Sequence, residues 1–594
     1  MGRERYRGSA RGCVFKMSQL SFWETPLFAP CEDVKIDALR GFGAPGERVA
    51  LSFSVSSMAP QETEIEIENG DLTGENSSIA REKIACFVVK EWVQSGIGMY
   101  QTAPERVLEL LVKDDREVLR DNRSRRCAHW KHPAHWRHLA RTPKFYCPPR
   151  IRLEGNVRTV LWRNERKQIW LETHVPNDAP AGKYRGFLEI SIGKNSSKTE
   201  RLALEIEVLP IRLLQPTQDF FIWYKGTLDC VLSQHHVSRA LFTAQLRDIF
   251  AHGFTSFSLH ESCPRFLQKA LDLAHEIGFC RNVVLSICPQ KVATIDFHDM
   301  TPVFYLSDEI DMRGEKLARA HFGNWHNAKA HNAKAQSRDA KTMASLVHQS
   351  AARKVFQRLE THPETADSRI VDATPDILSC YLPDNCHYFA MRSRFAHLQN
   401  QMTYFYWLSH MEKPNLHRVL AGLWLAQSGA EGIAPYCYQH LPPQNTSPFD
   451  DFAAADVDAP DLDPTNADRT FKALMTTYPA ANGSIATLQW KGLSLGIGDL
   501  KYLTTLEDAL KNASERASPA NRVLESAVRQ RTQAFLERLS LVNIEIRSSA
   551  QREPYAQIAP HEYADFREQM ARDIVALQSV IDEVADEKPE TARI

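Results

Sequence analysis

Hydrophobic and polar residues alternate with a period of two along much of the first third of the chain, which is typical of β-strands with one buried face. This alternation covers residues 47–55, 62–69, 158–164, 168–175, 184–192 and 201–209. Turn-forming runs separate these segments, as at 177–182 and 193–195. Many short strands between such turns predict an antiparallel β-sandwich. We therefore expect a sandwich domain over residues 20–213, preceded by a tail over residues 1–19.

The pattern changes near Pro216, where short apolar runs begin to alternate with amphipathic helical stretches. Strands are predicted at 220–226, 254–260, 281–287, 302–309, 376–382, 402–408 and 432–438, and helices at 237–253, 264–279 and 313–325. Such alternation indicates βα units and a parallel sheet. An eighth strand, best placed at 354–359, would close a TIM-type (β/α)8 barrel over residues 214–510. An open doubly wound sheet is the alternative.

The end of the chain, residues 511–594, has amphipathic and charged segments that predict a C-terminal helical region. Two local features stand out elsewhere. The tandem repeat HNAKAHNAKA at 326–335 is interpreted as an insertion on a solvated helix. The acidic run at 450–468 lacks the glycine turn and terminal glutamate of a calcium loop, so a solvated loop is favoured.

Composition excludes several classes of function. Lys and Arg number 72 and Asp and Glu 73, so the net charge of −1 argues against a nucleic-acid binder. No apolar run is long enough to span a membrane, and the basic N-terminus lacks the apolar core of a secretory signal. The 12 cysteines are scattered without a CxxC pair and predict reduced thiols. We expect a cytoplasmic protein that needs neither a metal nor another cofactor.

The sequence YLSDE at 305–309 holds the sharpest candidate for chemistry. Asp308 and Glu309 follow an apolar strand, and the C-terminal ends of barrel strands carry catalytic groups. Two neighbouring carboxylates can divide acid and base roles when their surroundings separate their pKa values. The alternative is that an acid here caps the helix that follows.

Four segments of the chain, in their order and spacing, match a known pattern that includes this carboxylate pair. They are QIWLETHVPNDAPAGKYRGFLEI (168–190), VFYLSDE (303–309), PNLHRVLAGLWLAQSGAEGIAPYCY (414–438) and YPAANGSIATLQWKGLSLGIGDLKYLTTLEDAL (478–510). Together they make residues 20–510 resemble glycoside hydrolase family 123 and the related domain-of-unknown-function family 4091. That resemblance implies a β-sandwich joined to a TIM barrel.

The resemblance also implies an activity, that of an exo-acting β-N-acetylhexosaminidase usually selective for N-acetylgalactosamine. Its mechanism would be retaining and substrate-assisted, because the sugar's own acetamido oxygen attacks the anomeric carbon. Asp308 would stay ionised and orient the acetamido group, while Glu309 would act as general acid and then base. The implied partner is a glycan or oligosaccharide, and the sequence gives no oligomeric state.

Sugar rings bind flat apolar faces, so aromatic residues on the other strands are candidate substrate contacts. These are Trp223, Tyr224, Tyr404, Tyr406, Trp407, Tyr436, Tyr438 and Trp490. Alternation places Tyr404 and Tyr406 on one face and Tyr436 and Tyr438 on another. Barrel packing is the alternative for each. Arg418, which matches the family's helix arginine, is expected to form a salt bridge near the pocket.

The closing segment departs from the family pattern. Lys491, Ser494 and Gly498 replace an acid, an arginine and an aspartate, whereas Asp499 and Tyr502 remain. A buried ion-pair network is therefore expected to be exchanged or lost, which bears on substrate selectivity.

A second cluster consists of Cys127, His129, His132, His135 and His138. Because Pro133 interrupts the helix that would align the histidines, a basic loop is favoured over a zinc site.

Two other functions stay open on the sequence. One is a glycosidase of different sugar specificity with a separate carboxylate nucleophile, for which Asp229, Glu261 and Asp384 are candidates. The other is a non-catalytic carbohydrate-binding protein on the same fold.

Overall fold

The chain divides into two units, each described here by itself. One contains Met1–Lys90, Leu111–Glu117 and Arg152–Ile211, and the other contains Glu91–Leu110, Val118–Ile151 and Arg212–Ile594. The computed structural model describes residues 15–19, 36–57, 59–94, 105–117, 150–163, 165–193, 198–228, 235–287, 292, 294–307, 340–346, 376–381, 401–407, 414–439, 475–515, 519–540, 558 and 560–586.

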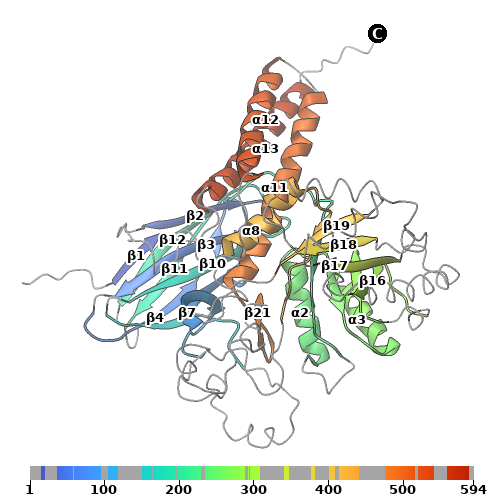
Figure 1. Ribbon diagram of the computed structural model, residues 1–594. Helices are drawn as coiled ribbons and strands as arrows, with labels where there is room; N and C mark the ends of the chain where they lie inside the picture. Colours follow the sequence, from blue (N-terminus) through green and yellow to red (C-terminus); the bar gives the residue numbers. More distant parts are fainter. Residues whose placement is uncertain are drawn as a thin grey trace, which may run out of the picture. The chain divides into compact units, whose positions relative to one another are not determined.

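Two β-sheets make up most of the first unit (Figure 1). The first sheet has the order β1 (Phe15–Gln19), β3 (Arg48–Ser57), β10 (Arg166–His174), β7 (Ile84–Gln94) and β8 (Glu105–Val112). The second has the order β2 (Ala38–Gly43), β12 (Lys198–Val208), β11 (Gly182–Ile192), β4 (Thr63–Asn69) and β9 (Val157–Leu161), with β5 (Leu72–Thr73), β6 (Ser78–Ile79) and the 3-10 turn η1 (Arg81–Lys83) beside it.

Alternation along the strands decides which side chains are buried in this unit. In β4, Ile65 and Ile67 are buried whereas Glu64 is exposed, so one face of the strand is apolar. The sandwich predicted from the sequence is confirmed. One pairing departs from it, because β2 runs parallel to its neighbour β12.

A closed barrel of eight parallel strands forms the centre of the second unit. Its strands are β13 (Asp219–Ile222), β14 (Ser256–Leu259), β15 (Asn282–Leu285), β16 (Thr301–Ser307), β17 (Lys341–Leu346), β18 (Ile377–Tyr381), β19 (Met402–Tyr406) and β20 (Gly432–Ile433). This confirms the TIM-type barrel over the open sheet. The fifth strand, β17, lies at a position that the sequence did not predict, and residues 354–359 lie outside the described residues.

Local signals set the limits of the helices that follow the first two strands. In α2 (Arg239–Ala251), the Ser238 side chain accepts the backbone N–H of Leu241 at 3.2 Å, and Gly253 beyond the end has a φ of 91°. Helix α3 (Pro264–Ile277) begins with proline at its first turn and ends at Gly278, whose φ is 117°. The predicted helices at 237–253 and 264–279 are therefore confirmed.

After the barrel the chain forms a hairpin and three long helices. The helices α8 (Pro414–Ala421) and α9 (Leu423–Ser428) precede β20; then come β21 (Thr477–Ala480), β22 (Gly483–Ala486), α11 (Leu488–Glu515), α12 (Pro519–Ser540) and α13 (Pro560–Asp586). Phe535 of α12 stacks on Phe566 of α13, with ring centroids 4.0 Å apart. Helix α11 continues through residue 510 and packs on α8, α12 and α13.

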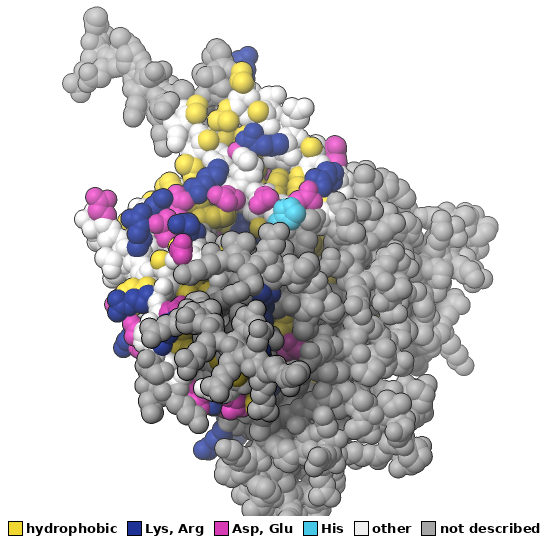
Figure 2. Space-filling model, turned by 90° about the vertical axis from the view of Figure 1, so that its left-hand side faces the viewer, with side chains coloured by type: hydrophobic (Ala, Val, Ile, Leu, Met, Phe, Trp, Pro, Cys, Tyr) yellow, Lys and Arg dark blue, Asp and Glu magenta, His cyan; other side chains and the backbone are white. Residues whose placement is uncertain are grey.

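Several sequence features lie outside the described residues. These are the repeat at 326–335, the acidic run at 450–468, the helix predicted at 313–325 and the cluster from Cys127 to His138. Within the described ranges, no group of His, Cys, Asp or Glu is arranged to hold a metal ion. None of the helices described is both long and apolar enough to cross a membrane. Figure 2 shows basic and acidic side chains intermixed on the described surface of one face.

Candidate active site

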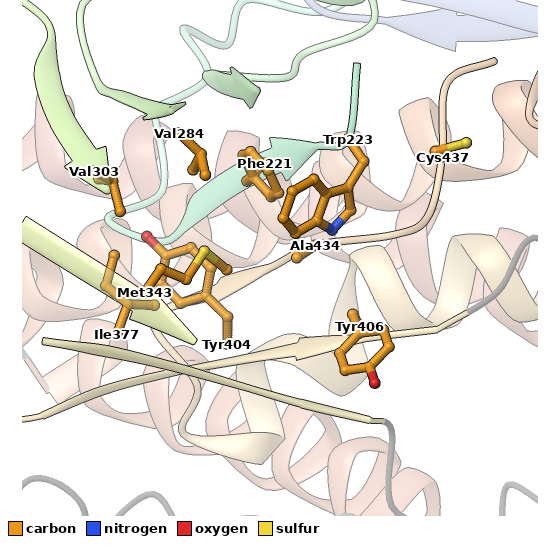
Figure 3. Close-up of a cluster of buried hydrophobic side chains, with 10 residues drawn as sticks. All are labelled: Phe221, Trp223, Val284, Val303, Met343, Ile377, Tyr404, Tyr406, Ala434 and Cys437. Carbon is orange, nitrogen blue, oxygen red and sulfur yellow. The ribbon is translucent and has the colours of Figure 1, made fainter. Parts of the chain in front are cut away.

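The barrel interior is filled by side chains from alternate strand positions (Figure 3). The buried apolar cluster consists of Phe221, Trp223, Val284, Val303, Met343, Ile377, Tyr404, Tyr406, Ala434 and Cys437. Strand β14 contributes none of these: its Ser256 side chain donates to Asp219 of β13, and its Ser258 side chain accepts the backbone N–H of Tyr224 just beyond β13. The interior is thus a packed core whose bulky residues come from the other strands.

Tyr404 belongs to the N-terminal end of this interior. Its hydroxyl donates to Asp219 Oδ2 at 2.7 Å, and Asn282 Nδ2 donates to the same oxygen at 2.8 Å. Thr255 and Ser256 donate to Oδ1. Burial, reinforced by the Asp219 carboxylate, raises the pKa of Tyr404 well above its usual range, so the phenol stays a donor. Active sites of such barrels occupy the opposite end, and Tyr404 is therefore not part of the site we propose.

Aromatic side chains gather at the C-terminal end. Trp223, directly after β13, meets the Tyr305 ring edge-on at a centroid distance of 4.8 Å and lies 6.3 Å from the Tyr436 ring. Tyr406 is part of the same cluster, and in Figure 3 it lies at the Trp223 end. Trp223 and Tyr406 are each 7 % exposed, and Tyr436 is partly buried.

Tyr305 is a member of this group that the sequence analysis missed. Its hydroxyl pairs with Ser345 Oγ on β17 at 2.8 Å. Alternation from Val303 would have placed Tyr305 in the interior, because both residues lie on the same face of one strand.

Strand β16 is irregular just before the predicted acids. Its register against β17 shifts between Tyr305, opposite Met343, and Ser307, opposite Ala344, and the strand then ends at Ser307. Such bulges re-aim the side chains near them. Asp308 and Glu309 follow directly in sequence and lie outside the described residues. Adjacent acids can serve one pocket only where regular alternation ends, and the described part of β16 meets that condition.

Polar groups follow the neighbouring strands β14 and β15. His260 Nδ1 lies 3.3 Å from Ser286 Oγ. Glu261 is buried; its Oε1 accepts the backbone N–H of Leu228 at 2.6 Å and its Oε2 accepts the Thr227 hydroxyl at 3.1 Å. Glu261, one of the alternative nucleophiles, therefore holds the segment after β13. Asp229 and Asp384, the other two, lie outside the described residues.

Two of the predicted aromatic contacts point out of the barrel, towards α2. Tyr224 donates to Gln245 Oε1 at 2.7 Å, and Tyr438 donates to Asp248 Oδ2 at 2.8 Å. Both rings are almost completely buried. Tyr436 and Tyr438 do not share a face, contrary to the expectation, because β20 ends at Ile433 and alternation does not extend to them.

Two tryptophans of the predicted set also pack outside the barrel. Trp407 is fully buried and donates to His417 Nδ1 of α8 at 3.0 Å. Trp490 of α11 stacks on Phe254 at a centroid distance of 5.0 Å and is fully buried as well. Neither ring offers a surface to a sugar in this arrangement.

Arg418 forms the expected salt bridge. Its Nε and Nη2 donate to the two oxygens of Asp499 at 2.6 and 2.9 Å, and both side chains are buried. Arg567 of α13 adds a second cation, 3.1 Å from Asp499 Oδ1. A Cβ atom at Gly498 would lie 3.0 Å from Arg567 Nη2, so the missing side chain gives this arginine room.

Lys491 has a new partner in place of the family's acidic pattern. Its Nζ lies 3.0 Å from Nε2 of His252, a buried residue that directly follows α2. In the closing segment, Asp499 thus pairs with Arg418 and Arg567, and Lys491 contacts His252. Ser494, the third departure, has no contact in the structure that explains it.

These features define a β-sandwich protein with a (β/α)8 barrel, a carboxylate pair after the fourth barrel strand and appended helices. The chain is similar to a family 123 glycoside hydrolase from Clostridium perfringens, a structure described in connection with glycolipid glycan hydrolysis. The likeness covers 95% of this chain and 100% of the other, with a TM-score of 0.58 and 10% sequence identity. The resemblance seen in the sequence motifs is confirmed for the fold.

Other solved structures are more distant. Gas2p of Saccharomyces cerevisiae in complex with laminaripentaose matches with a TM-score of 0.33 and 11% identity over 49% of this chain and 69% of that one. A xyloglucanase of Bacteroides ovatus matches with a TM-score of 0.29 and 7% identity over 81% and 100%. Scores this low carry no argument. No protein-family model and no curated protein sequence matches the chain.

Proposed function

We propose that this protein is an exo-acting glycoside hydrolase that removes terminal β-linked N-acetylhexosamine, with N-acetylgalactosamine as the preferred sugar. One observation carries the proposal: the register of β16 against β17 shifts after Tyr305, and the strand ends at Ser307, immediately before Asp308 and Glu309. Catalytic groups of such barrels sit at the C-terminal ends of the strands. The acids are thus expected where a substrate enters.

The proposed reaction uses the substrate as its own nucleophile. The 2-acetamido oxygen attacks the anomeric carbon as the glycosidic bond breaks, and Glu309 gives its proton to the departing oxygen. An oxazolinium ion forms, and Asp308 stabilises it by accepting a hydrogen bond from its N–H. Water then attacks the anomeric carbon and loses a proton to Glu309. The configuration is retained because the anomeric carbon is inverted twice.

Aromatic side chains supply the expected sugar contacts. Trp223, Tyr406 and Tyr436 all follow or end strands at the same end of the barrel as Ser307. Aromatic faces bind the apolar C–H surfaces of a sugar ring, and the Tyr hydroxyls can orient its polar groups. The likeness to the Clostridium perfringens enzyme supports a glycosidase, but a shared fold alone does not define an activity.

Substitution of the two acids tests the proposal. With a 4-nitrophenyl and a methyl β-N-acetylgalactosaminide as substrates, Glu309→Gln is expected to lower kcat/KM for the methyl glycoside by about 10²- to 10⁴-fold. The loss for the nitrophenyl substrate should be smaller, because nitrophenolate leaves with little protonation. Asp308→Asn should slow both substrates, since the charge that it removes stabilises the intermediate in each case.

The matched control is Glu276→Gln, which removes an exposed carboxylate on α3 and should leave both rates unchanged. Hydrolysis that survives Glu309→Gln undiminished would contradict the proposal. Binding of N-acetylated sugars without any turnover would instead indicate the non-catalytic carbohydrate-binding protein.

A further inference from the structure

Three basic side chains gather where β13 and β14 end. Lys225 lies three residues beyond β13, His260 lies one residue beyond β14, and His235 lies on the segment between β13 and α2. Burial, and then the Lys225 charge, lowers the pKa of both His235 and His260 to about 4. The two imidazoles of the cluster are therefore neutral at neutral pH.

Two of these groups have unused hydrogen-bonding capacity. Lys225 Nζ lies 5.1 Å from the centre of the Tyr436 ring and makes no ion pair within the part of the chain that the structure describes. His260 Nε2 is buried and has no hydrogen-bond partner there. A buried polar atom without a partner is unfavourable, so His260 Nε2 is expected to meet a group that the protein chain does not supply.

Glu261, the carboxylate next to His260 in sequence, is not the hydrogen-bond partner of His260 Nε2. Both oxygens of Glu261 accept hydrogen bonds from the segment after β13, one from Leu228 and the other from Thr227. The Ser286 hydroxyl, 3.3 Å from His260 Nδ1, adds one more polar group to the same edge. Lys225, His260 and Ser286 therefore lie just beyond the ends of three neighbouring strands, at the end of the barrel where Trp223 and Tyr436 also lie.

We propose that Lys225 and His260 form a subsite for an anionic substituent, an ester sulfate or phosphate, on the terminal amino sugar. This deepens the proposed function and rests on it. Lysine side chains and imidazole N–H groups donate strong hydrogen bonds to anionic oxygens, and Lys225 and His260 supply these two types of donor. The Lys225 charge would also offset the repulsion between the substituent and the two acids at 308 and 309.

Equilibrium binding tests this subsite without relying on turnover. Isothermal titration calorimetry would compare N-acetylgalactosamine with its 4-sulfate, 6-sulfate and 6-phosphate on the full-length protein. At least one anionic sugar should bind about tenfold more tightly than the neutral sugar, equivalent to about 1.4 kcal/mol. Preference for the sulfates alone assigns a sulfate ester, and equal preference for sulfate and phosphate assigns a general anion subsite.

Substitutions show whether Lys225 and His260 cause the preference for the anionic sugar. Lys225→Met, and His260→Asn as a second variant, should reduce the ratio of anionic to neutral affinity towards one. Lys269→Met is the matched control, because Lys269 is an exposed lysine that also lies over an aromatic ring, 5.3 Å from that of Phe266. It should keep the full ratio.

Equal affinities for neutral and anionic sugars in the natural protein would overturn the proposal, as would a preference that persists in Lys225→Met. The two proposals fail separately. Loss of the anionic preference leaves hydrolysis of the neutral glycoside standing, whereas absent hydrolysis with an intact preference refutes the enzyme and keeps the subsite.

Discussion

Side chains of one barrel strand stabilise the fold at its N-terminal end and border the proposed active site at its C-terminal end. On β19, Tyr404 completes a hydrogen-bond network around Asp219, while Tyr406 lies two residues nearer the C-terminal end. A period-two pattern predicts the face that a residue occupies, and it correctly placed both on one face of the strand. It does not predict depth along the barrel axis, which depends on the register between strands.

The two histidines at the barrel end make the protein sensitive to acid. In the unfolded chain an imidazole has a pKa of about 6.5, whereas His235 and His260 have a pKa of about 4 in the folded chain. Between these values the unfolded state binds protons that the folded state does not. The thermal midpoint is therefore expected to fall as the pH drops from about 6.5 to about 4.

Replacing one histidine should weaken this dependence. His260→Gln is expected to flatten the fall in midpoint over this pH range, measured by differential scanning calorimetry. His561→Gln, which changes an exposed histidine on α13, should leave the slope as it is. Identical slopes in His260→Gln and the natural protein would show that His260 is not held neutral by the fold.

Among the barrel strands, those with strong apolar runs were predicted, and β17, which has none, was missed. Strand β17 has the sequence KTMASL. Of its described side chains, Met343 lies in the interior cluster, and Ser345 is buried and pairs with Tyr305. This sequence has no apolar run. Its pairing with neighbouring strands in the closed barrel, and not its own composition, makes it a strand. The register shift in β16 could not be predicted either, since it is a property of the pairing with β17.

The crossing of α8 and α11 depends on glycines. A Cβ atom at Gly496 would overlap the carbonyl oxygen of Arg418, whereas at Gly498 it would meet only the flexible end of Arg567 at 3.0 Å. Gly496→Ala is therefore expected to destabilise the protein by about 1–3 kcal/mol through overpacking. Gly498→Ala should be close to neutral, because the gain in helix propensity of up to about 1 kcal/mol offsets a small movement of Arg567.

Thermal or denaturant unfolding of the two variants side by side measures this difference. The same residue change in one helix makes each variant the control for the other. If both alanines had equal effects, the close approach of α8 and α11 would not be what requires glycine at 496.

At the scale of the whole molecule, the sequence predicted the sandwich, the barrel and the C-terminal helices because each leaves a periodic pattern along the chain. The pairing of Asp499 with two arginines could not be predicted, since the second, Arg567, lies 68 residues further along the chain, on another helix. The likeness of fold to a family 123 enzyme at 10% identity has the same origin: patterns of burial persist where individual residues change. The positions of Asp308 and Glu309 relative to each other remain a prediction.

A pair of substrates distinguishes displacement by the substrate's own acetamido group from attack by a carboxylate of the protein. The measurement is kcat/KM of the natural protein for 4-nitrophenyl β-N-acetylgalactosaminide and for the matching N-trifluoroacetyl compound. Fluorine withdraws electrons from the acyl oxygen and makes it a weaker nucleophile. If that oxygen attacks the sugar, kcat/KM should be at least about 100-fold lower for the second substrate, which raises the activation free energy by about 2.7 kcal/mol. Equal rates would mean that a carboxylate of the protein attacks the sugar, and the account would be wrong.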